Sequence, residues 1–184
     1  MKPNSLFVLF SLVGFLLGCG EETLPKPKAM LRLDYPKPKM KGVDAKHFGF
    51  MGNAMAQVKE ESEAGLTLDY PHMKGTIFLT YKPVRNNLEK LLTDAQKLSY
   101  EHVAKADDIV AQPYINEDDK VYGMFFEVIG NAASQAQFYA TDSTQHFVTG
   151  SLYFYARPNY DSIYPAAVYL QKDIRKIMES LRWK

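Results

Sequence analysis

Cysteine is nearly absent from this sequence: the 184-residue chain contains one, Cys19. A single cysteine excludes an internal disulfide and any zinc site built from CxxC pairs. The four histidines (His47, His72, His102 and His146) include no HxH or HxxxH pair. The sequence therefore predicts no metal centre and no cofactor other than lipid attached to the cysteine.

An excess of charge of one sign is also lacking, because 22 Lys and Arg stand against 21 Asp and Glu. Nucleic-acid-binding domains usually carry a strongly basic footprint, so we expect no nucleic-acid partner. The phosphate-binding patterns GxxxxGK[ST] and GxGxxG are absent, as is the GxSxG nucleophile elbow. These absences predict a protein that is not an enzyme.

Two short segments resemble catalytic or binding motifs and need an interpretation. Residues 142–146 read DSTQH and contain all three residue types of a catalytic triad. Triads are assembled from distant segments, so we expect Asp142 and Ser143 to stabilise a turn between two strands instead. Residues 130–134 read GNAAS, which favours a hairpin-type connection over a phosphate cradle.

The N-terminus contains an uncharged run of thirteen residues, Leu6–Gly18. A membrane-spanning helix needs about 20 apolar residues, and the run has the size of a signal-peptide core. It ends in Leu16-Leu17-Gly18-Cys19, which resembles a bacterial lipobox. We therefore expect residues 1–18 to be a lipoprotein signal peptide and Cys19 to carry diacylglycerol and an N-acyl chain. The alternative is an exported protein or membrane-spanning anchor with a chance cysteine.

A basic stretch follows the cysteine. Residues 19–30 include two prolines and read as a semi-extended, acylated tether. Residues 26–46 contain seven Lys and Arg against two Asp. Beside a lipid anchor, such a segment either touches anionic headgroups or is a solvated loop.

Apolar periodicity predicts alternating strands and helices over the rest of the chain. Residues 64–84 have the pattern of a β-hairpin, and residues 86–103 have a helical apolar face that starts at a capping-box-like Asn86 and Glu89. Strands are expected over 109–115, 120–129, 136–141 and 146–156. Strands apolar on both faces predict a sheet that is covered on both faces.

A second helix is predicted near the C-terminus. Apolar residues recur there at steps of four and three, which is typical of one buried helical stripe: Ile163, Ala167, Leu170, Ile174, Ile177 and Leu181. We expect Ser162 to cap this helix, Pro165 to lie in its first turn, and Trp183 to act as a core plug rather than a binding anchor. Residues 31–184 are thus predicted to form a single α+β domain, a mostly antiparallel sheet flanked by two helices, with an element order similar to the PsbP/Mog1-like fold.

Several of these segments resemble one protein family. The lipobox at Cys19, the PKPK segment, residues 76–109, residues 121–154 and the ending ESLRWK are similar to the gliding-motility lipoproteins of the GldD family of Bacteroidota. The most specific stretch is Gly130–Phe154. The resemblance implies a non-enzymatic envelope lipoprotein that is required for gliding and linked to type IX protein secretion.

The resemblance also implies partners, namely other gliding and type IX secretion proteins of the envelope, in addition to the membrane through the lipid anchor. The residues after Cys19 indicate a location: Gly20 is not the aspartate that retains lipoproteins at the inner membrane of enteric bacteria, and Glu21-Glu22 resembles an acidic export signal. The expected location is therefore the outer membrane, facing the periplasm. The loops in the most family-like stretch are the candidate interaction surface, because loops carry function more often than the elements they join; their residues are Asn131, Ser134, Asp142, Ser143 and His146. The alternative is a periplasmic lipoprotein that binds a small ligand or lipid.

Overall fold

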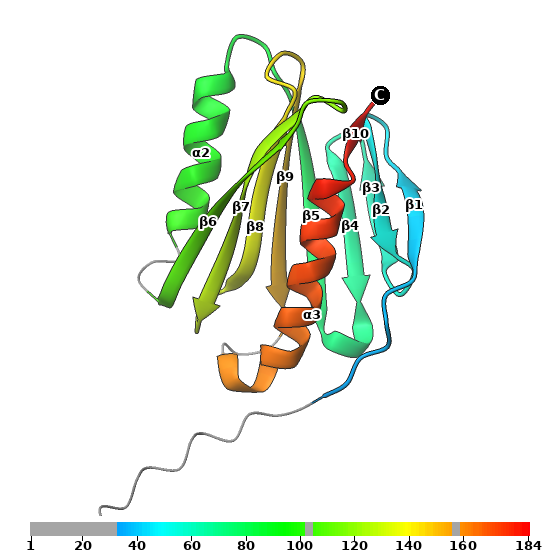
Figure 1. Ribbon diagram of the computed structural model, residues 1–184, viewed down its shortest axis with the longest axis vertical. Coiled ribbons are helices and arrows are strands. Elements are labelled where there is room, and N and C mark those ends of the chain that lie inside the picture. The colour runs from blue at the N-terminus through cyan, green and yellow to red at the C-terminus, as the bar shows by residue number, and fades with distance from the viewer. Residues whose placement is uncertain (1–32, 102–104, 156–158) are drawn as a thin grey trace, which may run out of the picture.

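The computed structural model describes residues 33–101, 105–155 and 159–184 (Figure 1). The expected signal peptide, Cys19 and the tether lie outside the described residues. The described chain forms strands and helices in this order: β1 (Met40–Asp44), β2 (Phe48–Asn53), β3 (Gln57–Ser62), β4 (Gly65–Tyr70), the 3-10 turn η1 (Pro71–Met73), β5 (Gly75–Pro83), α2 (Leu88–Tyr100), β6 (Ala106–Asn116), β7 (Val121–Gly130), β8 (Ser134–Thr141), β9 (His146–Phe154), α3 (Tyr160–Glu179) and β10 (Arg182–Trp183).

A seven-stranded antiparallel sheet forms the centre of the domain, in the order β3-β4-β5-β9-β8-β7-β6. The helices α2 and α3 lie on its opposite faces (Figure 1). Every residue of β8 is consequently buried. The predicted α+β class, with a mostly antiparallel sheet flanked by two helices, is confirmed. The PsbP/Mog1-like order stays a prediction.

The larger hydrophobic core lies between the sheet and α3. Leu170, Ile174 and Ile177 of the predicted stripe have no exposed surface, and they pack with sheet residues such as Ile77 and Leu152. Full burial of an aliphatic side chain is worth about 1.5–3 kcal/mol. This stripe therefore fixes α3 to the sheet and sets the position of everything that follows the helix.

A smaller core lies under α2. Leu91 and Ala95 face the sheet residues Phe126, Tyr139 and Phe147, whose aromatic rings contact one another. Because Phe147 and its neighbour Val148 point to opposite faces of β9 and are both buried, each face of this strand is covered. The sequence of β9 is apolar on both faces because each face packs against a hydrophobic core.

The predicted caps of both helices were wrong. The first helix begins at Leu88, after Asn87; the expected cap Asn86 has a positive φ of 56°, and the side chain of Asn87 accepts the Arg85 N–H. The second begins at Tyr160, so the Ser162 hydroxyl bonds back to the Asn159 carbonyl instead of capping. In the second helix a residue from a distant loop supplies the cap that the local sequence does not.

A second, three-stranded sheet in the order β1-β2-β10 was not predicted. Its outer strands pair with β2 in antiparallel register, with Val43 opposite Phe50 and Trp183 opposite Phe48. The last strand has two residues, too few for a periodic pattern. It joins the end of the described chain to its beginning, because β10 directly follows α3.

Candidate functional site

The turn between β8 and β9 is built around one carboxylate, that of Asp142. Its Oδ1 accepts the backbone N–H groups of Thr144 at 3.0 Å, Gln145 at 2.8 Å and His146 at 2.8 Å. Its Oδ2 accepts the Thr144 hydroxyl at 2.9 Å. Ser143 takes the left-handed conformation with φ 67°. Asp142 therefore stabilises the turn, as the sequence predicted.

The ionisation of Asp142 follows from these bonds. Partial burial alone would raise the pKa of this carboxyl, but the N–H groups of His146, Gln145 and Thr144 outweigh burial and lower the pKa below its ordinary value. The hydrogen bonds described for the turn include none that joins this carboxylate to the His146 ring. Instead, the His146 Nδ1 lies 3.0 Å from the Tyr81 hydroxyl. Asp142, Ser143 and His146 therefore include the residue types of a catalytic triad, but no described hydrogen bond links the Asp142 carboxylate to the His146 ring.

A row of four rings lies beside the turn, and we call His47, Tyr81, His146 and Trp183 the aromatic row; its two outer pairs are stacked and its middle pair is tilted. The His47 and Tyr81 ring centroids are 4.2 Å apart at 12°, and those of His146 and Trp183 are 5.2 Å apart at 8°. The Trp183 Nε1 donates to the Lys120 carbonyl at 2.9 Å. All four rings are partly exposed. The row brings together the β1–β2 connection, which carries His47, and the strands β5, β9 and β10 at one end of the molecule.

The sequence did not reveal this row, because its members are far apart in the chain. Only His146 was a candidate residue. Trp183 packs against the main core, as expected of a core plug, but part of its surface is exposed to solvent. Two signals in the sequence pointed to the row: the candidate residue His146 and a lone tryptophan in the last residues.

The residues of the other candidate loop, which joins β7 to β8, form contacts within the domain. The Asn131 Oδ1 accepts the Tyr160 N–H at 2.8 Å and so caps the N-terminus of α3 from a distant loop. Ser134, expected in this loop, is the first residue of β8 and is fully buried, with its hydroxyl bonded to the Ala136 carbonyl. Placing Ser134 on an interaction surface was therefore wrong, because both sheet faces are covered at this point.

Two surface hollows between described residues lack the features of a ligand site. One hollow, of about 470 Å³, lies between β1, β2 and the end of α3, and its walls carry the ion pairs Asp44–Lys184 and Asp119–Arg182. Another, of about 690 Å³, lies between the start of α2 and the turn residues Ser143 and Thr144. Both are open to solvent. Neither gathers the convergent, buried polar groups that mark a specific ligand site.

A buried polar network ties the first described residues to α3. Asp173, which is 3% exposed, accepts the Asn53 side-chain N–H at 2.8 Å. Asn53 also donates to the Tyr169 hydroxyl, which donates in turn to the Pro36 carbonyl at 2.9 Å. Burial raises the pKa of the Asp173 carboxyl, although neighbouring Asn53 and Tyr70 act in the opposite direction. The network positions the N-terminal segment rather than a substrate.

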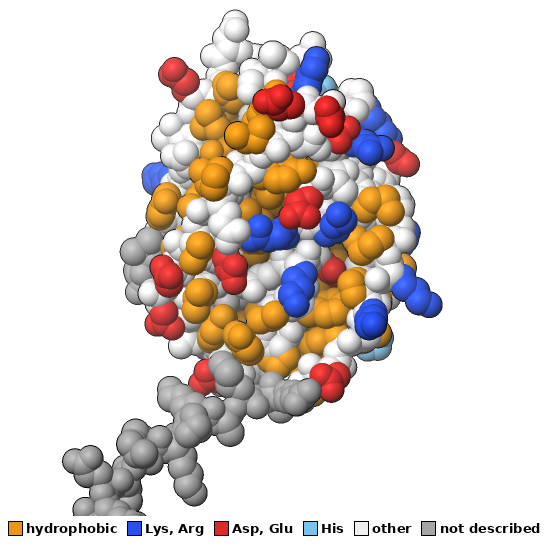
Figure 2. Space-filling model, viewed as in Figure 1, with side chains coloured by type: hydrophobic (Ala, Val, Ile, Leu, Met, Phe, Trp, Pro, Cys, Tyr) orange, Lys and Arg blue, Asp and Glu red, His pale blue; other side chains and the backbone are white. Residues whose placement is uncertain are grey.

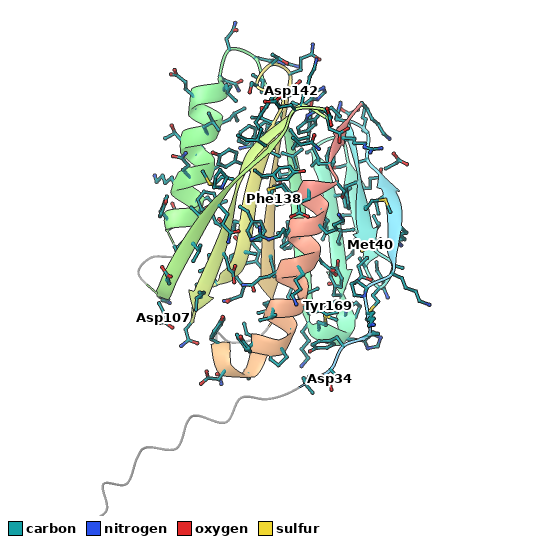
Figure 3. All side chains as sticks on the ribbon, viewed as in Figure 1. Asp34, Met40, Asp107, Phe138, Asp142 and Tyr169 are labelled. Carbon is teal, nitrogen blue, oxygen red and sulfur yellow. The ribbon has the colours of Figure 1, made fainter. Side chains whose placement is uncertain are left out.

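Two further properties bear on function. Within the described residues, no three His, Cys, Asp or Glu side chains gather as they would around a metal ion. No helix among these residues has both the length and the apolar surface needed to cross a bilayer. Figure 3 shows that Asp142 and Asp34 lie at opposite ends of the molecule, so the turn is far from the point where the described chain begins.

Comparison with known proteins adds a family. The family model described as gliding motility lipoprotein GldD matches residues 20–183. A search of the curated proteins finds no match to the chain. The family match covers both helices, every strand and the candidate turn.

Proposed function

Because the chain belongs to the gliding motility lipoprotein GldD family, we propose that it acts as a non-enzymatic accessory component of gliding and type IX secretion, held at the membrane by lipid on Cys19. The single observation that carries this proposal is the family match, which begins at residue 20, next to the lipobox cysteine. Anchoring by acyl chains fits the match because each buried CH₂ contributes about 0.8 kcal/mol.

The use made of the candidate catalytic groups supports a non-enzymatic role. The Asp142 carboxylate accepts backbone N–H groups, and the His146 ring is stacked on Trp183 and bonded to Tyr81. A general base needs a free nitrogen within reach of a nucleophile, and the exposed Ser143 has no described hydrogen bond to this ring. These groups stabilise a turn and a stack.

The proposed partner-binding surface is the end of the molecule that carries the turn and the aromatic row. Ser143, Thr144 and Gln145 are exposed there, on a turn whose backbone is fixed by Asp142. Rigid aromatic and polar groups on a fixed frame are typical of protein interaction surfaces. Since this end lies opposite Asp34 (Figure 3), a partner reaches it without displacing the N-terminal segment.

The alternative, a small-ligand or lipid carrier, gains no support from the interior. The space between α3 and the sheet is filled by fully buried side chains, among them Leu170, Ile174 and Leu152. A carrier needs a largely enclosed cavity of about 300–1,000 Å³, whereas the hollows described above are open. For location we propose the outer membrane with the domain in the periplasm.

The testing experiment is a clean deletion in the native host, scored for colony spreading and for type IX cargo in the medium. Loss of both, restored by the wild-type gene but not by Cys19→Ser, is expected. Metabolic labelling with palmitate checks the anchor directly, since labelling should disappear in Cys19→Ser. Normal spreading with normal secretion in the deletion strain refutes the proposal, and labelling that survives Cys19→Ser refutes the anchor.

A matched pair of variants tests the proposed surface. Ser143→Arg and Gln145→Arg place bulky charge on the exposed turn and leave every side chain bonded to Asp142 in place, whereas Gln96→Arg places the same charge on exposed α2. We expect the turn variants to reduce spreading while the folded protein accumulates normally, and the helix variant to behave as wild type. Wild-type spreading by both turn variants removes the turn from the proposal.

A further inference from the structure

Exposed lysines border the seam between α3 and the N-terminal segment. On the helix, Lys172 and Lys176 follow Tyr169 by three and seven residues, so all three share one helical face. Tyr169 is bonded to the Pro36 carbonyl and its ring lies 5.3 Å from that of Tyr35. The helix face that carries the two lysines therefore runs beside the segment that leads into β1.

The segment contributes the other cations. Lys37 and Lys39 are exposed on either side of Pro38, and Lys41 is exposed on the edge strand β1. Lys176 lines the same hollow as the β1 residues Gly42 and Val43. We call the exposed side chains along this seam the basic seam: Lys37, Lys39, Lys41, Lys172 and Lys176. Figure 2 shows Lys and Arg side chains on the face that α3 and β1 share.

Local anions do not neutralise the basic seam. Among the described residues, none of its five side chains forms a hydrogen bond or an ion pair. Asp44, on β1, is paired with Lys184. Asp119, in the same hollow as Lys176, is paired with Arg182, and Asp173, next to Lys172, is buried. Asp34 and Glu179 also lie near the seam, and the five lysines outnumber them. Unpaired lysines on one face favour a negatively charged partner surface.

From this arrangement we propose that the basic seam docks on the anionic headgroups of the membrane in which the protein is anchored; the inference rests on the proposed lipid anchor. The short chain between Cys19 and the domain favours the membrane as the occupant. Leu33 follows Cys19 by fourteen residues, a reach of at most about 50 Å. The described chain begins beside the seam, so the seam lies where the tether joins the domain and within reach of the headgroups.

Lysines near such a surface act additively and over a short range. Each contributes about a fivefold gain in binding to anionic lipid, and the gain falls off within about 8 Å at physiological salt. Docking would fix the orientation of the domain and direct the turn at Asp142, which is far from Asp34 (Figure 3), away from the point of attachment.

The experiment measures the seam without the anchor. The chain from residue 19 carrying Cys19→Ser is sedimented with vesicles of phosphatidylethanolamine and 40% phosphatidylglycerol, or of phosphatidylcholine alone. Two four-lysine variants with equal net charge are compared: Lys37→Gln, Lys39→Gln, Lys172→Gln, Lys176→Gln in the seam, and Lys59→Gln, Lys82→Gln, Lys90→Gln, Lys97→Gln elsewhere. All eight lysines are exposed, so both variants are expected to fold, which far-UV circular dichroism checks.

We expect salt-sensitive binding to the anionic vesicles only, weakened by about 600-fold in the seam variant, about fivefold for each of four lysines, and much less in the control. Equal binding by the two variants, or equal binding to both vesicle types, overturns the proposal. Lost spreading in the seam variant with unchanged vesicle binding also overturns it, because it assigns the lysines to an acidic protein partner. If the chain with all its lysines shows this vesicle binding but the wild-type protein is not labelled by palmitate in the host, the basic seam is supported and only the lipid anchor is refuted.

Discussion

Removing the Asp142 carboxylate should unfold the turn that carries the proposed partner surface. Its three backbone N–H bonds, at 2.8–3.0 Å, each fall in a class worth about 1.5–3 kcal/mol when buried. Asp142 is only half-buried, and Thr144 and Gln145 are exposed, so water replaces most of the lost bonds in Asp142→Ala. We expect a loss of about 2 kcal/mol, or a Tm lower by about 4–8 °C for a domain of this size.

The pH dependence separates charge from shape. Because the pKa of Asp142 is lowered in the folded state, its stabilisation is present above the unfolded pKa of about 3.9. It is lost as the pH falls through the lower folded pKa. Asp142→Asn keeps an acceptor oxygen but no charge, so we expect it to lose roughly half as much as Asp142→Ala at pH 7. The difference between Asp142→Asn and wild type should shrink below about pH 4.

Urea unfolding followed by the fluorescence of Trp183, the one tryptophan, measures both effects. A change in the midpoint with an unchanged slope reports stability alone. Ser143→Ala is the matched control, since this exposed side chain forms no described hydrogen bond. A loss below about 0.5 kcal/mol for Asp142→Ala, or an Asp142→Asn difference that is constant from pH 7 to pH 3, refutes the reasoning.

Three further predictions concern the fold. Asn131→Ala should lower the free energy of unfolding in urea by about 1 kcal/mol because α3 loses its cap, whereas Asn131→Asp should keep the cap and the wild-type stability. Gly150→Ala would put a Cβ 2.1 Å from the Phe138 ring, so the soluble yield and Tm should fall sharply, while Gly42→Ala, with open space around it, should leave Tm within about 1 °C. Asp173 has a raised pKa, so its carboxyl destabilises the folded state increasingly as the pH rises from the unfolded pKa towards the folded one. Asp173→Asn should therefore match or exceed wild-type stability at pH 7.5 and lose that advantage at pH 4, measured by thermal melts at both pH values.

Elements with a repeated apolar pattern were predictable. The stripe through Leu170, Ile174 and Ile177 specified a helix and its buried face, because 3.6-residue periodicity needs only local sequence. In the same way, a strand apolar on both faces specified a sheet covered on both sides, as β9 shows with Phe147 and Val148. The turn at Asp142 was also predictable, because an aspartate bonds to backbone that follows it closely.

Features set by distant contacts were not predictable. The cap of α3 comes from Asn131, 29 residues before the N–H that it accepts, so the local candidate Ser162 was preferred wrongly. The aromatic row joins residues as far apart as His47 and Trp183, and β10 is too short for any period. Ser134 looked like a loop residue because its small neighbours Ala132 and Ala133 hide the start of a buried strand.

The pairing of β1 with β2 has a mechanical consequence for a protein held by one end. The first strand begins at Met40 and runs along β2 for five paired residues, nearly parallel to the long axis of the molecule (Figure 1). Tension between the anchor and a partner at the Asp142 end would act along these strands. It would shear all the β1–β2 bonds together instead of opening them one at a time. If the proposed anchor and partner hold the two ends, this pairing would resist a pull better than one in which the bonds open in sequence from the N-terminal side.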